Sequence, residues 1–139
     1  MGDDARKTQD LEVLRQGHIR ITKSLESQFE KSGFEVILNQ EYVVAINNHL
    51  FHGELDIKSV DPYRKIIIAV EVKGIKNKTT SKKAYLQLSK DFFHLSSMHP
   101  NYHIVLMYAY RDEANKKGYA VKRCNQDKIK SILEDTLSP

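Results

Sequence analysis

The sequence predicts an α/β protein, a three-layer α/β/α sandwich around a central mixed sheet. Apolar residues recur at helical spacing in three segments, and five other segments show the alternating or continuously apolar patterns of strands. These segments follow one another as helix, three strands with a hairpin, helix, two strands and helix, which is an order typical of layered α/β folds. With 139 residues, the chain is expected to form one domain over 1–139.

The first helix is expected from Gln9 to Lys31, with Gly33 as its C-terminal stop. It is defined by five apolar residues at helical spacing: Leu11, Leu14, Ile21, Leu25 and Phe29. Residues 1–8 are polar and are expected to be disordered. A strand is expected from Phe34 to Ile46, and the next strand begins at Leu50 after an Asn-Asn turn.

The most informative stretch, 53–73, is expected to form a β-hairpin. Leu55 and Ile57 alternate with charged residues, as in a half-buried strand, and Asp61–Arg64 has the composition of a turn. The return strand, Lys65–Lys73, is apolar on both faces until its end, as in a central strand. An even-length loop places four charged side chains on one face of the hairpin: Glu54, Asp56, Glu71 and Lys73.

Carboxylates that share one face of a hairpin repel one another unless a cation lies between them. Hard oxygen ligands at this density suit Mg²⁺ or Mn²⁺, so the hairpin predicts a divalent metal site. The plainer interpretation is a solvent-exposed face with mixed charges, because charge on strands is common. The position of the charges, at the end of an apolar strand rather than alternating along it, favours the metal site.

Asp56, followed after a short hairpin by Glu71-Val72-Lys73, resembles the active-site signature of the PD-(D/E)XK nuclease superfamily. The Gly-Glu-Leu-Asp and Val-Glu-Val-Lys segments are similar to those of archaeal Holliday junction resolvases and related small nucleases. The resemblance covers about Gly33–Leu95 and departs from the family at Leu55, where a proline is usual. It implies a nuclease-like domain with the restriction endonuclease-like fold.

The resemblance also implies roles for the hairpin residues. Asp56, Glu71 and the carbonyl group of Val72 would hold Mg²⁺ or Mn²⁺. Lys73 would orient the attacking water or steady the developing negative charge, and Glu54 would be a supporting ligand. The implied activity is that of a metal-dependent endonuclease, with DNA as the substrate by analogy with the family.

The resemblance also points to the first helix as a possible source of a residue of the metal site. Relatives often carry a glutamate there, at a position that falls near Thr22 and Lys23 in this chain, so the glutamate is displaced or missing. Glu26 and Glu30 are the nearby candidates. Both also fit an ordinary solvated helix face.

The segment after the hairpin is basic and is expected to be a flexible loop, with Ser81 as the N-cap of a helix that ends near Ser97. In the resemblance, Gln87 lies where relatives place an active-site glutamine or lysine, and Lys83 is the second candidate. Both also fit an ordinary polar helix face. Five lysines of this region are candidates for nucleic-acid contacts, although a merely solvated surface is the alternative: Lys76, Lys78, Lys82, Lys83 and Lys90.

The C-terminal third is expected to complete the sheet. A strongly apolar strand is expected over Tyr102–Tyr110, and a short strand over Tyr119–Arg123 follows a polar loop. A last helix is expected over Asp127–Leu137, with its apolar residues on one face.

The net charge of +4 permits a polyanionic partner. Nucleic acid is the expected partner. Because one active site cuts only one strand, either a homodimer or a place inside a larger assembly is expected in addition. The single Cys124 excludes an internal disulfide and cysteine-rich zinc sites and suits an intracellular location, cytoplasmic or nucleoid-associated. No apolar run has membrane-spanning length, so no membrane association is expected.

Two other functions stay open at this point. One is an RNA endonuclease of the cap-cleaving type found in some viral polymerases. The other is a catalytically silent nucleic-acid-binding module with the same fold, which the incomplete first-helix glutamate favours.

Overall fold

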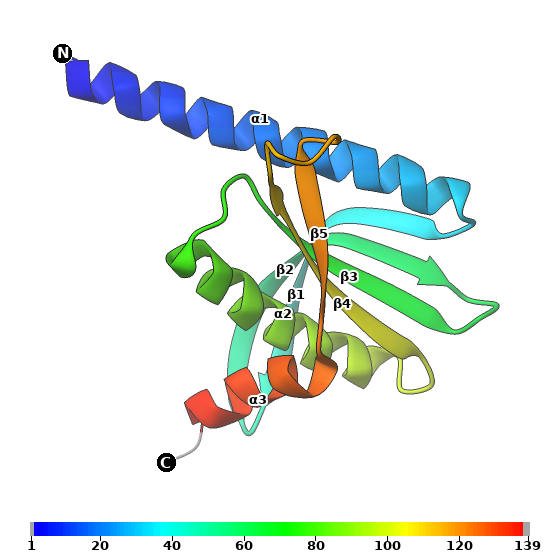
Figure 1. The fold of residues 1–139 in the computed structure, drawn as a ribbon. Helices are drawn as coiled ribbons and strands as arrows, with labels where there is room; N and C mark the ends of the chain where they lie inside the picture. The colour runs from blue at the N-terminus through cyan, green and yellow to red at the C-terminus, as the bar shows by residue number, and fades with distance from the viewer. Residues whose placement is uncertain (1, 138–139) are drawn as a thin grey trace.

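The computed structural model describes residues 2–137, with side chains described from residue 11 onward, and this part of the chain holds three helices and five strands (Figure 1). The elements in chain order are α1 (Gly2–Lys31), β1 (Glu35–Ile46), β2 (His49–Asp61), β3 (Ile66–Lys73), α2 (Lys78–Met98), β4 (His103–Arg111), β5 (Tyr119–Cys124) and α3 (Gln126–Leu137). The predicted order of helices and strands is therefore confirmed.

The five strands form one mixed sheet in the order β1-β2-β3-β4-β5. β3 and β4 run parallel, and the other neighbouring strands are antiparallel. Parallel neighbours need a crossover connection, and α2 supplies it between β3 and β4. The end of β3 that carries the charged residues therefore leads directly into α2.

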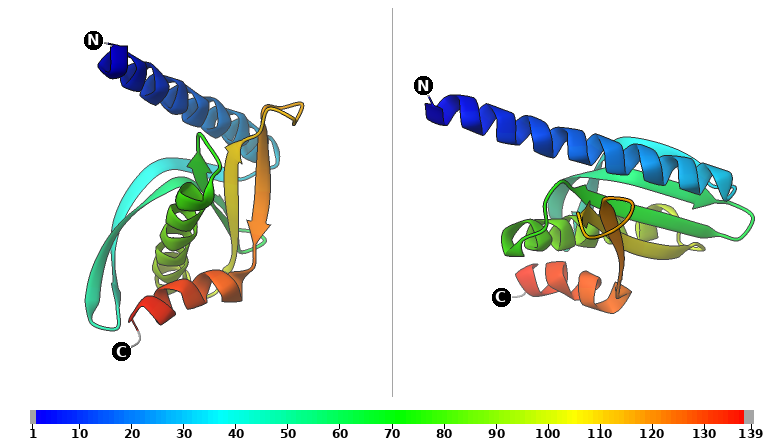
Figure 2. Two further views of the ribbon diagram at one scale, coloured as in Figure 1. Left: turned by 60° about the vertical axis from the view of Figure 1, so that its left-hand side comes forward. Right: turned by 45° about the horizontal axis from the view of Figure 1, so that its top comes forward.

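Helix α1 covers one face of the sheet, and α2 and α3 cover the other (Figure 2). Ile21 and Leu25 of α1 share a core with Val70 on one face. On the other face, Leu88 of α2 and Leu133 of α3 belong to a second core. This arrangement is compatible with the expected three-layer sandwich. It also places α1 and α2 on either side of the β2–β3 hairpin.

The β2–β3 hairpin has the register expected from an even-length loop. Backbone pairing ends at Ile57 with Val70, and one further step in the same register faces Asp56 with Glu71. The turn is closed by the Asp61 carboxylate, which accepts two backbone N–H groups of the turn. The two carboxylates predicted to face each other are thus brought together by local pairing.

The β1–β2 hairpin changes faces along its length. Leu38 packs with the α1 core, whereas Tyr42 packs with the α2 core, although residues at even spacing share a face in a regular strand. Asn39, at φ 54°, has the left-handed conformation that asparagine tolerates, and it breaks the alternation. On β2 the same change separates Leu55 from Ile57, which the sequence pattern places on one face. The far half of the hairpin curves round α2 (Figure 2).

The first helix is longer than predicted. α1 begins at Gly2 rather than Gln9, so the expected disorder of residues 1–8 is wrong for the described part, and Met1 lies outside the described residues. The polar residues before Gln9 include no proline, and nothing local ends the helix there. None of the helices within residues 2–137 combines the length and the apolar character that crossing a membrane requires.

α2 also begins earlier than predicted, at Lys78 instead of after Ser81. Asn77 is its N-cap: the Asn77 Oδ1 accepts the Thr80 N–H at 2.9 Å, and the Thr80 Oγ1 accepts the Asn77 N–H at 3.0 Å. This reciprocal pair satisfies two backbone donors, whereas Ser81 lies inside the helix. Most of the lysines predicted to lie on a flexible loop therefore lie on the first turns of a helix.

Candidate active site

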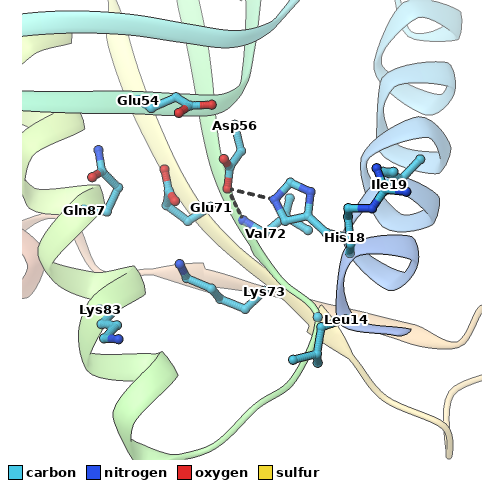
Figure 3. A pocket seen from close by; sticks show the side chains of 12 residues that line it. Leu14, His18, Ile19, Glu54, Asp56, Glu71, Val72, Lys73, Lys83 and Gln87 are labelled. Atoms are coloured by element: carbon cyan, nitrogen blue, oxygen red, sulfur yellow. Dashed lines mark hydrogen bonds and ion pairs between the residues drawn. The ribbon is translucent and has the colours of Figure 1, made fainter. Parts of the chain in front are cut away.

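A cavity of about 610 Å³ lies between α1, the end of the β2–β3 hairpin and the first half of α2 (Figure 3). Its lining includes seven residues that the sequence predicts for the site: Glu54, Asp56, Glu71, Val72, Lys73, Lys83 and Gln87. Four further lining residues come from α1, and the sequence predicts none of them: Leu14, Arg15, His18 and Ile19. The hairpin and two helices thus converge on one concave site.

Asp56 is the most firmly anchored carboxylate of the cavity. Its Oδ2 accepts a hydrogen bond from the Val72 amide at 2.8 Å, and His18 Nε2 lies 3.6 Å from the same oxygen (Figure 3). Burial acts to raise the pKa of Asp56, but the contacts with His18 and the Val72 amide outweigh burial, and the pKa lies below its ordinary value. Asp56 is therefore expected to be ionised at neutral pH.

The Val72 amide reaches the Asp56 side chain because backbone pairing between β2 and β3 ends at Ile57 and Val70. The N–H and C=O groups of one strand residue point to the same side of the strand. The Val72 carbonyl is therefore directed toward the Asp56 side, where the resemblance implies a metal ligand.

Glu71 is buried, with 3% of its surface exposed, and its Oε1 has no hydrogen-bond partner. Asp91 of α2 lies against it, completely buried, and its Oδ2 also lacks a partner. Burial, followed by the charges of Asp91 and Asp56, raises the pKa of Glu71 well above its ordinary value, and burial raises the pKa of Asp91 as well. We expect the pair to hold a proton at neutral pH, because two adjacent buried carboxylates do not both ionise without a cation.

A small polar network fixes Asp91. Its Oδ1 accepts hydrogen bonds from the Tyr42 hydroxyl and from Gln87 Nε2, the latter at 2.8 Å. Tyr42 crosses Gly53 so closely that a Cβ atom at Gly53 would lie 2.4 Å from the tyrosine ring. Gln87 therefore lines the cavity as predicted, but its amide is engaged with Asp91. Sequence reasoning misses Asp91, although its place one helical turn after Gln87 puts both on the same side of α2.

α1 reaches the site through a close contact with Gly74. A Cβ atom at Gly74 would lie 2.6 Å from the backbone oxygen of Leu14, so only glycine allows this approach. Gly17 of α1 lies opposite Gly74. This contact places the next residue of the helix, His18, beside Asp56. A glycine inside a helical pattern is the sequence signal for such a close approach.

The first helix supplies a histidine, His18, to the site, where relatives in the resemblance often carry a glutamate. Glu26, the predicted supporting residue, does not line the cavity, because it lies about two turns farther along α1 than His18. The Thr22 hydroxyl lies 3.5 Å from His18 Nδ1. With Thr22 as the donor, the Nε2 proton faces Asp56.

The lysines predicted to contact nucleic acid are divided between the cavity and the surface. Lys83 lines the cavity, and Lys78 and Lys82 are exposed on the first turns of α2. Lys76 lies in the short loop before them, with its ammonium group over a tyrosine ring of β4. Lys90 does not line the cavity, because its ammonium group lies over the ring of Phe51 in β2.

The donor set of the cavity suits a hard divalent cation. In the described part of the chain, no group of three His, Cys, Asp or Glu side chains is arranged to hold a metal ion as it stands. Glu71 Oε1 is nevertheless a buried carboxyl oxygen without a donor, and the ionised Asp56 faces it. Oxygen ligands of this kind are those that Mg²⁺ and Mn²⁺ take, so the residues fit the ion that the sequence predicts.

No protein-family model, no curated protein and no solved structure matches this chain. The resemblance of the 53–73 segment to nucleases therefore stays a prediction from short motifs. The function proposed next depends on the residues that the cavity brings together.

Proposed function

We propose that this protein is a metal-dependent endonuclease of the PD-(D/E)XK type, with the restriction endonuclease-like form of the α/β fold, and that it hydrolyses phosphodiester bonds in DNA. The observation that carries the proposal is the meeting of Asp56, Glu71 and Lys73 in one cavity at the end of the β2–β3 hairpin. The two carboxyl groups supply negative charge for a cation, and the lysine supplies positive charge for a phosphate group.

Asp56, Glu71 and the Val72 carbonyl would hold Mg²⁺ or Mn²⁺, with Glu54 in support. When bound, such an ion polarises the scissile phosphate and lowers the pKa of a bound water. Asp56 is prepared for this role, because the Val72 amide and His18 stabilise its charge. Glu71 has to lose its proton to serve as a ligand. Asp91, which lies beside it, can stay protonated when Glu71 is ionised.

Lys73 would act on the phosphate group and on the attacking water. It lies two residues after Glu71 on β3, hence on the same face, and it extends into the cavity (Figure 3). Its ammonium group can donate hydrogen bonds to a phosphate oxygen as negative charge develops there. Lys83 adds a second cation from α2, and Gln87 acts by holding Asp91 in place.

A catalytically silent nucleic-acid-binding module is the second candidate. One observation favours it: α1 presents His18 to the cavity instead of the glutamate that the resemblance implies. An RNA endonuclease of the cap-cleaving type would use the same groups on a different substrate, so only a comparison of substrates separates it from a DNA endonuclease.

Cleavage assays test all three functions. Supercoiled DNA, branched DNA and single-stranded RNA are each incubated with the protein in Mg²⁺, in Mn²⁺ or in EDTA. We expect metal-dependent cleavage of DNA that Glu71→Gln abolishes and that Glu113→Gln, an exposed control in the β4–β5 loop, leaves unchanged. Undiminished cleavage in EDTA or by Glu71→Gln would overturn the proposal. Cleavage of RNA alone would favour the RNA endonuclease, and binding without cleavage would favour the silent module.

A further inference from the structure

A second cavity, separate from the active site, lies between α2, the end of β5 and the start of α3. It has a volume of about 450 Å³, and we call it the α2–α3 groove. Its lining residues are Tyr85, Lys122, Arg123, Cys124, Asn125, Lys128, Ile129 and Ile132. None of these is acidic, and the volume lies within the range of about 300 to 1,000 Å³ that is usual for sites that bind small organic groups.

The floor of the groove is apolar and aromatic. Tyr85 is half-buried, and its ring meets the buried Tyr108 ring edge-on, with the centroids 5.6 Å apart. Ile129 is buried and Ile132 half-buried on the facing side of α3. A tyrosine held rigidly by its neighbours offers a planar face to an unpaired nucleobase.

The rim of the groove is cationic. Lys122 Nζ donates a hydrogen bond to the Tyr85 hydroxyl at 3.2 Å and lies over the Tyr85 ring, 5.6 Å from its centroid, with further protons left for a ligand. Lys128 lies in the first turn of α3, where its N–H is capped by Asn125 Oδ1 at 3.0 Å. The N-terminal end of a helix adds to the attraction for an anion. Asp127, the nearest acidic residue in the sequence, does not line the groove.

The strand register connects the groove with the active site. Glu71 of β3 is paired with Tyr108 of β4, and Tyr108 is paired with Lys122 of β5. Since neighbouring strands lie about 4.8 Å apart, the backbones of Glu71 and Lys122 are separated by roughly 10 Å. The exposed lysines at the start of α2 are on the same helix as Tyr85.

We propose that the α2–α3 groove binds an unpaired nucleotide of the nucleic acid whose scissile phosphate lies in the active site. The base lies against Tyr85, Ile129 and Ile132, and the flanking phosphates contact Lys122 and Lys128. The inference rests on the proposed nuclease function and deepens it, because it makes a single-stranded segment beside the cleavage point part of the substrate. The groove has an aromatic floor, a cationic rim and no acidic lining residue. A site for single-stranded nucleic acid requires these features.

Binding in EDTA tests the phosphate contacts without any cleavage. The affinity for a fluorescent single-stranded oligonucleotide is measured against salt concentration for wild type and for Lys122→Ala/Lys128→Ala. The matched control is Lys116→Ala/Lys117→Ala, which removes the same charge from exposed positions in the β4–β5 loop. We expect the groove variant to bind about tenfold more weakly, with a salt slope lower by about 0.7 for each lost contact. A groove variant that binds like the control overturns the inference.

Base contact is tested with an oligonucleotide that carries a fluorescent adenine analogue. Stacking on Tyr85 should quench the analogue in wild type, and Tyr85→Leu should abolish the quenching while the salt slope stays unchanged. If Tyr85→Leu does not fold, the binding measurement with Lys122→Ala/Lys128→Ala still tests the inference. Loss of cleavage in Glu71→Gln together with control-like binding of the lysine variant would refute the groove alone. Weakened binding of the lysine variant in a protein that cleaves nothing would refute the nuclease alone.

Discussion

Glu71 of β3 and Asp91 of α2 lie against each other in the core, and each keeps one carboxyl oxygen without a hydrogen-bond partner. Both groups are almost completely removed from water, so a charge on both of them is strongly unfavourable. A shared proton or a bound cation would relieve this repulsion. The state of this pair therefore links the pH, the metal and the stability of the protein.

The metal-free protein should lose stability through this pair as the pH rises. Burial raises the pKa of Asp91 to about 7 and the pKa of Glu71 well above its ordinary value. The folded state therefore keeps protons that the unfolded chain releases above a carboxyl pKa of about 4, and the resulting stability is lost as the pH rises through the folded pKa values. Burial lowers the pKa of His94, which acts in the opposite direction. The quantity to measure is therefore the difference in urea unfolding free energy between wild type and Glu71→Gln in EDTA.

We expect Glu71→Gln to become progressively more stable than wild type between about pH 4 and about pH 7. Its advantage near neutral pH should be on the order of 1 kcal/mol or more, because one of two opposed carboxyl groups becomes an amide that can donate to Asp91. A difference that stays constant over this range would show that the pair does not titrate there.

Divalent metal should stabilise wild type and not the variants of its ligands. Millimolar Mg²⁺ or Mn²⁺ should raise the melting temperature of wild type, because an ion that binds only the folded state shifts unfolding by mass action. Asp56→Asn should lose this gain. In EDTA it should be no more stable than wild type, since the Val72 amide and His18 already stabilise the Asp56 charge. Calorimetry with and without metal measures both effects, and a full metal-dependent gain in Asp56→Asn would exclude Asp56 as a ligand.

The two glycines at the contact of α1 with the site should respond oppositely to alanine. A Cβ atom at Gly74 would lie 2.6 Å from the Leu14 oxygen, so Gly74→Ala should push α1 away and cost about 1 to 3 kcal/mol. A Cβ atom at Gly17 would lie 3.9 Å from the Gly74 Cα, an ordinary contact, so Gly17→Ala should gain up to about 1 kcal/mol from helix propensity. Urea unfolding gives the change in unfolding free energy for each variant. Equal changes in the two variants would contradict the close approach of α1.

His18 should matter for cleavage because it lies beside Asp56. His18→Ala removes the group that stabilises the Asp56 charge from the α1 side, and we expect cleavage to fall by about 10 to 100-fold. His49→Ala, at the exposed start of β2, is the matched control and should keep wild-type activity. If both variants cleave equally well, α1 contributes no functional group to the site.

The lysines at the start of α2 and in the loop before it should carry part of the affinity for DNA. Replacing Lys76, Lys78 and Lys82 with alanine should weaken binding and reduce its dependence on salt, because each phosphate contact releases counterions. Anisotropy titrations over a range of salt concentrations measure the slope. An unchanged slope in the triple variant would place the DNA elsewhere on the surface.

The sequence by itself determined the order of the elements and limited the residue opposite Glu71 to Asp56 or Glu54, and the observed register is the one with Asp56. Both are local properties: side chains alternate along strands, and the even-length turn between β2 and β3 sets which residues face each other. Lys73 lies close to Glu71 along the same strand, so it was equally predictable that both side chains lie on one face of the sheet. The start of α2 was mispredicted by one helical turn because a capping box of Asn77 and Thr80 outweighs the serine that follows.

Only the tertiary structure decided which other groups surround these residues. His18 reaches Asp56 because α1 crosses the sheet at Gly74, and Asp91 reaches Glu71 because of the way α2 is rotated about its axis. The change of faces at Asn39 likewise depends on one left-handed residue within a strand. These contacts join segments far apart in the chain. They depend on interhelical distance and side-chain volume, and the local periodicity of the sequence records neither.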